Sequence, residues 1–134
     1  MTEDSTGEPD GIVTKLSPRS VPDTVARFTG ILGDKGLKLF AVIDQSAEAA
    51  AAGLTLRETV LVIFGNPAAG TLVMQAAPLS AVDLPLKVAV WADGAQTKVS
   101  YAAPAALGAR YGLSSDLTAK LAGIGPLTDA LVAP

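Results

Sequence analysis

Two aspartates at the ends of predicted strands are the residues best placed for acid–base chemistry. Asp44 follows the apolar pair Val42-Ile43, and Asp83 precedes Leu84-Pro85. When two carboxyl groups meet, each raises the cost of ionising the other, and one can then act as a proton donor. Aspartates more often cap helices or bond backbone amides. Asp44 and Asp83 are therefore candidate acid–base residues, with capping as the favoured alternative.

A turn between a strand and a helix supplies the candidate binding site. Gly65, Asn66 and Pro67 follow the apolar run 60–64, and Gly70 comes about one helical turn later. Amides at a helix N-terminus favour phosphate or carboxylate, so Gly65, Asn66 and Gly70 are candidate residues for a small anionic ligand. The run lacks both the P-loop Gly-Lys-Ser/Thr and the full Gly-x-Gly-x-x-Gly fingerprint. The structural alternative is that Asn66 caps the helix and Pro67 begins it.

Trp91 and Tyr101 are the candidate interface residues. They lie on two strands joined by the turn Asp93-Gly94, and we expect them to form a cross-strand pair. Alternation along residues 86–91 places Trp91 on the face opposite the predicted core, and large aromatic side chains are enriched at interface cores. This pattern predicts a homodimer with Trp91 near the contact. The alternative is that the C-terminal segment 127–132 covers the indole.

The composition excludes several kinds of chemistry. The chain has no cysteine and no histidine, which rules out disulfides, a thiol nucleophile, His-based triads and histidine metal sites. We therefore expect no metal and no cofactor. The formal net charge is −3, but four of the 13 acidic residues fall within the first ten positions. The rest of the chain therefore has nine acidic and ten basic residues, and the basic residues are scattered along the sequence. This nearly neutral charge predicts no nucleic-acid-binding surface.

The sequence also predicts which residues form the folded domain and where in the cell the protein is located. Residues 1–10 are polar and acidic, unlike a secretory signal, and we expect them to form a disordered tail. Residues 11–134 are expected to form a single domain. No apolar run approaches the ~20 residues that a bilayer-spanning helix needs, so we predict no membrane association and a cytoplasmic location.

Periodicity and turn residues predict a sheet with helical connections. Five strands are expected, at residues 11–16, 37–43, 59–64, 86–92 and 97–101. Helices are expected near 20–35, 46–52, 67–77, 79–82 and 104–111 and from Ser115 onward, the first of them with one apolar stripe, Val21, Val25, Phe28 and Leu32. The Asp93-Gly94 turn requires an antiparallel pair. The predicted fold class is α+β, a two-layer sandwich of a mainly antiparallel five-stranded sheet with helices on one face.

A series of short blocks resembles a known family. The blocks are Gly36-Leu…Phe40-x-x-Ile43-Asp44, Ala50-x-x-Gly53-Leu54, Ile63-Phe64-Gly65-Asn66-Pro67-x-x-Gly70-Thr71-x-x-Met74, Asp83-Leu84-Pro85-Leu86, Trp91-x-Asp93-Gly94 and Ser100-Tyr101. Together they resemble the family called domain of unknown function 302, over most of the chain. The resemblance implies a TATA-box-binding-protein-like arrangement, β-α-β(4)-α, and pairing as homodimers. The family has no settled activity, so the resemblance implies no reaction.

One position departs from the family pattern. Where the family often has Asp-His after the second strand, this chain has Asp44-Gln45. A role that needed an imidazole at this position is lost here.

Two functions are compatible with these observations. The first is a non-catalytic homodimeric module that binds a small ligand or a protein partner, favoured by the missing histidine and cysteine and by the scattered charge. The alternative is an enzyme acting on a small molecule with Asp44 and Asp83 as its acid–base pair. Nucleic-acid binding would rest on fold likeness alone, and the nearly neutral domain lacks the basic surface it needs. The separation of the two carboxyl groups distinguishes the first two functions.

Overall fold

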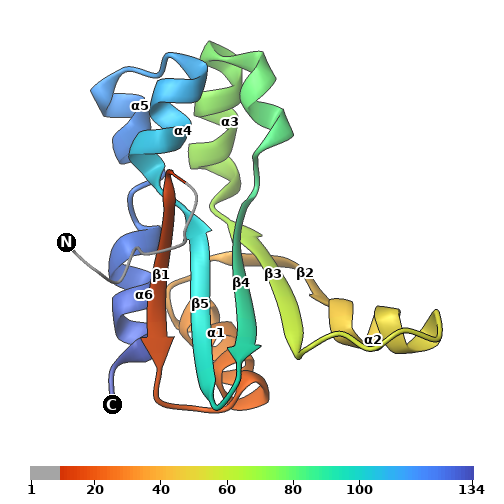
Figure 1. Cartoon of the computed structure of the whole chain (residues 1–134). Helices are drawn as coiled ribbons and strands as arrows, with labels where there is room; N and C mark the ends of the chain where they lie inside the picture. Colours follow the sequence, from red (N-terminus) through yellow and green to blue (C-terminus); the bar gives the residue numbers. More distant parts are fainter. Residues whose placement is uncertain (1–9) are drawn as a thin grey trace.

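The computed structural model describes residues 10–134, so the predicted acidic tail falls, apart from Asp10, outside the described residues. Figure 1 shows a sheet with helices behind it and at one end. The elements are, in order, β1 (Ile12–Ser17), α1 (Val21–Asp34), β2 (Lys38–Asp44), α2 (Gln45–Ala51), β3 (Thr59–Gly65), α3 (Pro67–Ala76), the 3₁₀ helix η2 (Pro78–Val82), β4 (Leu86–Asp93), β5 (Gln96–Ala102), α4 (Pro104–Tyr111), α5 (Ser115–Ala119) and α6 (Ile124–Val132).

The five predicted strands form one sheet in the order β1-β5-β4-β3-β2. Every neighbouring pair is antiparallel. Gly94 turns β4 into β5 with a φ of 60°, a left-handed conformation that favours glycine. The edges of the sheet are β1 and β2, and the register between β2 and β3 shifts by a bulge between Leu39 and Ala41. The predicted α+β class with a five-stranded antiparallel sheet is confirmed.

The main core lies between the sheet and the helices α1 and α6, which cover one of its faces (Figure 1). The apolar stripe predicted for α1 is correct, because Val21, Phe28 and Leu32 are all buried. The Phe28 ring meets Phe64 of β3 edge to face, with centroids 5.1 Å apart. Fully burying each such side chain contributes about 1.5–3 kcal/mol. These contacts hold β3, which leads into the candidate binding turn, firmly against the helices.

A second cluster lies at the end of the sheet where α3, η2, α4 and α5 gather (Figure 1). Its buried residues are Val73, Leu107 and Leu121. Gly108 of α4 packs closely on α5, since a Cβ added to it would lie 2.5 Å from Oγ1 of Thr118. The sandwich therefore carries a helical cap at one end, and only α1 and α6 form the layer predicted on one face.

The C-terminal helix predicted from Ser115 is two helices. Ser114, not Ser115, caps the first of them, α5, by accepting a hydrogen bond from the amide of Leu117. The chain then turns, so that Leu121 joins the second cluster and Ile124 joins the main core. Pro126 falls in the first turn of α6, where its missing N–H costs no helical hydrogen bond.

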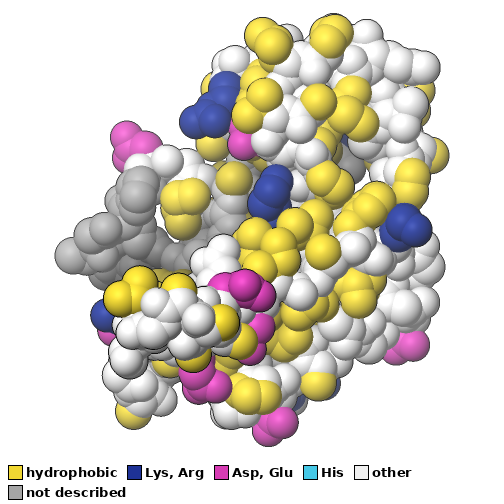
Figure 2. All heavy atoms as spheres, turned by 90° about the vertical axis from the view of Figure 1, so that its right-hand side faces the viewer, with side chains coloured by type: hydrophobic (Ala, Val, Ile, Leu, Met, Phe, Trp, Pro, Cys, Tyr) yellow, Lys and Arg dark blue, Asp and Glu magenta, His cyan; other side chains and the backbone are white. Residues whose placement is uncertain are grey.

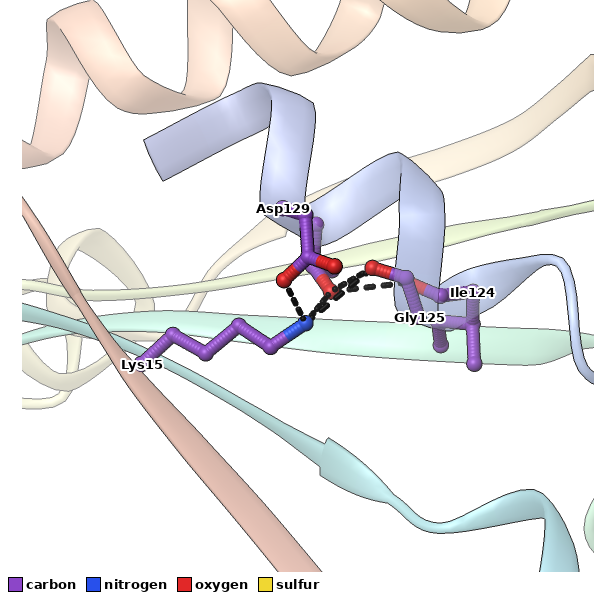
Figure 3. A network of polar contacts seen from close by, with 5 residues as sticks. Lys15, Ile124, Gly125 and Asp129 are labelled. Carbon is purple, nitrogen blue, oxygen red and sulfur yellow. Dashed lines mark hydrogen bonds and ion pairs between the residues drawn. The ribbon is translucent and has the colours of Figure 1, made fainter. Parts of the chain in front are cut away.

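Lys15 of β1 fastens the edge of the sheet to α6 (Figure 3). Its ammonium group donates to the carbonyl oxygen of Gly125 at 3.1 Å, to Oγ1 of Thr128 at 2.7 Å and to Oδ1 of Asp129 at 2.8 Å. It also lies 5.3 Å from the centre of the Tyr101 ring. One cation thus joins β1, β5 and α6 at this side of the molecule.

Candidate functional site

A cavity of about 310 Å³ lies where the end of β3 turns into α3. Its walls come from the start of β2, the β3–α3 turn, the segment before β4 and the α5–α6 turn. Most of the lining is apolar, and the residues are Leu37, Phe40, Phe64, Gly65, Asn66, Pro67, Ala69, Gly70, Thr71, Met74, Leu84, Pro85, Leu86, Lys120, Leu121, Gly123, Ile124 and Leu127. This volume is at the lower end of the range for small-molecule pockets. The cavity brings together the Phe-Gly-Asn-Pro and Leu-Pro blocks, which are about twenty residues apart in the sequence.

The three predicted ligand-binding residues, Gly65, Asn66 and Gly70, all line this cavity. Asn66 is the N-cap of α3, and Pro67 takes the first helical position, where its fixed φ suits the helix. The turn is therefore set locally by residue types that favour a helix start. The α3 helix then carries Gly70 and Met74 along the cavity wall.

The helix amides expected to bind an anion are already occupied. Oδ1 of Asn66 accepts hydrogen bonds from the amides of Ala68 at 3.0 Å and Ala69 at 3.3 Å. Pro67 has no N–H, and the amide of Gly70 donates to the carbonyl oxygen of Asn66. The capping alternative describes Asn66 correctly, and an anion at this helix end would have to displace its side chain.

Lys120 is an exposed residue in the lining of the cavity. Among the described residues that line the cavity, Lys120 alone carries a formal charge, and Asn66 and Thr71 add polar groups. Lys120 follows α5 directly and reaches the cavity through the α5–α6 turn. An apolar cavity with one cation in its lining suits a ligand with an apolar body and an acidic group.

Asp83 forms hydrogen bonds with side chains of α4. It thereby holds the neighbouring Leu84 and Pro85, which line the cavity, in place. Its Oδ2 accepts hydrogen bonds from the hydroxyl of Tyr111 and from the Arg110 guanidinium, the latter at 3.0 Å. The Tyr111 bond and, after it, the charge of Arg110 lower the pKa of Asp83, although partial burial opposes them. Lys87 donates to the carbonyl oxygens of Asp83 and Pro85. The Asp-Leu-Pro block, which contains a cis Leu84–Pro85 bond, is thus tied to α4.

Asp44 is a helix cap at the other end of the sheet. Its Oδ1 accepts bonds from the hydroxyl of Ser46 at 2.6 Å and from the amide of Ala47 at 2.9 Å, and these bonds lower its pKa. Asp44 lies opposite Val60 at the start of β3, whereas Asp83 comes before Leu86, which lies opposite Phe64 at the end of β3. Val60 and Phe64 are four residue steps apart along the strand, a distance of about 13 Å. The carboxyl groups do not meet, so the predicted acid–base pair is not formed.

The expected pairing of Trp91 with Tyr101 is wrong. Trp91 lies opposite Lys98, so its side chain is on the open face of the sheet, whereas Tyr101 is buried in the main core beneath the helices. The two rings therefore lie on opposite faces, and Tyr101 has no exposed surface to offer a partner. The prediction failed because neighbouring residues of a strand point to opposite faces, and register decides which ones meet.

The chain itself holds Trp91 in place. The indole Nε1 donates to Oγ of Ser100 at 2.9 Å. Arg57 and Lys98 lie 5.9 and 5.4 Å from the ring centre, within cation–π range. The segment 127–132 does not cover Trp91, because Leu127 and Val132 pack against the core on the other face. Whether a second copy also contacts Trp91 stays a prediction.

Sequence reasoning missed several cavity residues. Leu37 and Phe40 were expected only as part of a strand, Leu127 only as part of a segment that could cover Trp91, and Lys120 only as one of the scattered basic residues. They come together only because β2, α3 and the α5–α6 turn converge at one end of the sheet. The one local signal was the Phe-Gly-Asn-Pro block, which marked the correct end of the molecule.

Among residues 10–134, the side chains form no metal cluster and the helices include no membrane span. Within residues 10–134, no group of three or more histidine, cysteine, aspartate or glutamate side chains is arranged to hold a metal ion. No helix in this part of the chain is long and apolar enough to cross a membrane.

Taken together, the fold and the cavity define a small α+β sandwich with a helical cap and a pocket beneath it. The chain matches the family described as "Domain of unknown function DUF302" over residues 13–126, and it belongs to that family. The crystal structure of an uncharacterised conserved DUF302 protein from Bacillus stearothermophilus superposes with a TM-score of 0.78 at 19% identity, covering 92% of this chain and 97% of that one. This likeness confirms the fold.

Curated relatives match at higher identity but only in part. A protein named fluoride-specific ion channel FluC 1 from Brucella suis biovar 1 (strain 1330) is 38% identical over 123 residues, which is 88% of this chain and 48% of that protein. Proteins of the same kind from Brucella abortus biovar 1 (strain 9-941) and Brucella melitensis biotype 1 (strain ATCC 23456 / CCUG 17765 / NCTC 10094 / 16M) are also 38% identical, with 46% of each covered. The chain spans about half the length of these relatives.

Proposed function

We propose that this domain is a non-catalytic binding module whose cavity takes one small, mainly apolar ligand. The observation that carries the proposal is the convergence of the Phe-Gly-Asn-Pro and Leu-Pro blocks on one cavity of about 310 Å³. Concave, largely apolar pockets with a few polar groups are the usual form of a small-molecule site.

The ligand we propose has an acidic group at one end. The apolar lining would contact its body, and Lys120 would pair with its negative charge. This keeps the predicted preference for an anion but assigns it to a side chain, because the amides of Ala68 and Ala69 are bonded to Asn66. An ion pair that remains in contact with water contributes about 0.2–1 kcal/mol, so the charge would adjust the affinity and the apolar contacts would dominate it.

The separation of Asp44 and Asp83 supports binding over catalysis. Each carboxylate is bonded to local groups, and the causes of both lowered pKa values favour the ionised form. A general acid needs the opposite, a pKa raised toward neutrality. We therefore propose no reaction for this domain.

Binding of sodium octanoate and octanol tests the proposal, because the two molecules share a chain length and differ in charge. Isothermal titration of the wild type should detect both, with octanoate bound roughly threefold more tightly. The Gly70→Leu substitution extends a side chain from the cavity wall and should abolish both signals. Ala68→Leu adds the same side chain to the same helix at a position outside the lining and should leave them unchanged.

A further variant distinguishes the contribution of the apolar lining to binding from that of the Lys120 charge. Lys120→Gln should remove the preference for octanoate while octanol still binds. If neither molecule binds the wild type, or if Ala68→Leu and Gly70→Leu behave alike, the cavity is not the binding site and the proposal fails.

A further inference from the structure

The neighbouring strands β4 and β5 separate where they approach the helical cap (Figure 1). Their ladder begins at the hairpin turn and ends at the pair of Ala89 and Ser100. Both strands continue beyond this pair, since β4 begins at Leu86 and β5 ends at Ala102. The sheet therefore has a gap at its cap end, in the register where Lys87 and Ala102 would otherwise meet.

The backbone groups on both sides of this gap point into it. The amide of Ala92 donates to the carbonyl oxygen of Glu58 on the β3 side, so alternation along β4 directs the backbone groups of Lys87 toward β5. The amide of Ala103 donates to the residue before β1, so the backbone groups of Ala102 point toward β4. Within residues 10–134, neither Lys87 nor Ala102 has a ladder partner across the gap. Such a gap favours an occupant that can both donate and accept hydrogen bonds.

A second cavity, of about 260 Å³, lies at this gap. Its lining includes the last ladder pair, Ala89 and Ser100, and both residues of the gap, Lys87 and Ala102. Leu61 of β3 adds an apolar wall. The volume is slightly below the range for drug-sized ligands, so a suitable occupant is small.

Positive charge exceeds negative charge beside this cavity. The Lys87 ammonium donates to the carbonyl oxygens of Asp83 and Pro85, at 3.1 and 2.8 Å. An ammonium group has three donors, so one is left within the described part of the chain. The carboxylate of Asp83, which also lines the cavity, lies near Lys87 and bonds to Arg110 at 3.0 Å. Two cations thus surround one carboxylate, an arrangement that favours an acidic ligand.

The wider surface has the same trend. Figure 2 views the molecule from the side of β2 and α2 and shows basic side chains mainly in its upper half, toward the helical cap. Acidic side chains lie mainly in the lower half of this view. An anion approaching the cap end of the sheet therefore meets a more positive surface than it would at the other end.

We propose that this second cavity binds the C-terminal residue of a peptide. Such a residue carries a carboxylate for Lys87, an amide that donates and accepts for the backbone groups of the gap, and a side chain for the apolar wall. Capture of a terminal carboxylate and pairing with strand backbone are both established ways of recognising peptides. A fatty acid has no amide and would leave the backbone groups of Lys87 and Ala102 unpaired.

The inference does not rest on the ligand proposed for the first cavity. Leu86 and Ile124 line both cavities, so the two adjoin at these side chains. Lys87 and Ala102, which select the peptide, belong to the lining of the second cavity alone. Each site can therefore be blocked without removing the groups that define the other.

An NMR titration of the full chain with the dipeptide acetyl-Gly-Ala tests the inference. The amide resonances of Lys87 and Ala102 should shift as the peptide binds. The same peptide with an amidated C-terminus should bind roughly tenfold more weakly, because it offers Lys87 no carboxylate. Butyrate, which has a carboxylate but no amide, should also bind more weakly than acetyl-Gly-Ala.

Variants locate the binding. Ala89→Leu extends a side chain from the lining and should abolish the shifts, whereas Ala95→Leu adds the same side chain at the exposed hairpin turn and should leave them unchanged. Lys87→Gln should remove the preference for the acid over the amidated peptide. Gly70→Leu, which blocks the first cavity, should not alter peptide binding, and Ala89→Leu should not alter octanoate binding.

Hydrogen exchange of the free protein is a second readout, independent of any variant. The amide of Ala102 should exchange faster than that of Ser100, which is bonded in the ladder. Equal protection of the two amides overturns the inference, because the gap would then be closed. So does a wild type that does not bind acetyl-Gly-Ala, one that binds the amidated peptide equally well, or an Ala89→Leu variant that still binds.

Discussion

Asn66 lines the cavity, but its side-chain oxygen is used by the backbone of α3. Its side chain satisfies two amides at the start of α3, so it shapes the cavity without offering a free group to a ligand. Lys120, which no sequence motif marks, is the one formally charged residue among the described residues that line the cavity. Position in a motif and chemical availability are therefore separate properties in this cavity.

Replacing Asn66 by alanine should destabilise the protein by about 1 kcal/mol, the usual effect of losing an N-cap side chain. Urea denaturation of the two proteins measures the difference. Asn66→Asp retains a capping oxygen and should cost much less. A loss of several kcal/mol in Asn66→Ala would contradict a capping role and indicate that the side chain belongs to a larger buried network.

The carboxylate of Asp83 should make the stability of the fold depend on acid pH. Tyr111 and then Arg110 hold its pKa in the folded protein below the value in the unfolded chain. The stability that results is fully present above the unfolded pKa of about 3.9 and is lost as pH falls through the folded-state pKa.

Tyr111→Phe removes the first of these causes, so the pKa of Asp83 should rise toward its ordinary value. Carboxyl-detected NMR titration measures this change directly. Denaturation at about pH 5 and about pH 3 should show a smaller acid-induced loss of stability in Tyr111→Phe than in the wild type. Equal losses in the two proteins would show that the Tyr111 bond does not favour the carboxylate.

At the scale of elements, the helical cap depends on how closely α4 approaches α5. Gly108 has no room for a side chain, because an added Cβ would meet Oγ1 of Thr118 at 2.5 Å and its Cγ2 at 3.2 Å. Glycine inside a helix normally costs about 1 kcal/mol relative to alanine, so its presence in α4 is explained by this contact.

Gly108→Ala should therefore destabilise the protein by about 1–3 kcal/mol, despite the better helix propensity of alanine. Adding Thr118→Ala removes the two clashing atoms and should restore most of the loss. Gly30→Ala in α1 is the control, since no atom lies within 4 Å of its new Cβ and a gain of up to about 1 kcal/mol is expected. Thermal or urea denaturation of the four proteins measures these differences, and an unchanged stability of Gly108→Ala would show that the contact with Thr118 does not require glycine.

Sequence reasoning succeeded where structure is local and failed where it depends on assembly. The stripe of Val21, Phe28 and Leu32 and the turn at Gly94 follow from periodicity and backbone preference, and both are confirmed. The meeting of Asp44 with Asp83 depended on the length of β3 and on which strand ends share an edge. For Trp91 and Tyr101, the hairpin register decided the faces, and no short-range pattern in either strand reports it.

At the scale of the whole molecule, the cavity lies between the two hydrophobic clusters. Phe64 and Ile124 of the main core and Leu121 of the cap all contribute to its wall. A ligand in this position would contact the sheet, the cap and α6 together. The α2 helix, in contrast, contains no buried residue and projects from the body of the protein (Figure 1).

Native-state hydrogen exchange should reveal this gradient of stability. Amides of β3 and β4, which pair on both sides and carry the buried residues Val62 and Val88, should exchange only on global unfolding. Amides of α2 should exchange by local opening and be the fastest among the helices. Protection of α2 equal to that of the central strands would show that something beyond its own contacts, such as a second copy, holds it.

The position of Pro134 in the fold also determines how the domain can be joined to others. The chain ends at Pro134, after α6, beside the β1 edge and on the side of the sheet away from β2 (Figure 1). A reporter protein or a further domain attached after Pro134 would leave from that side, away from β2. A carboxy-terminal fusion should therefore leave the cavity accessible.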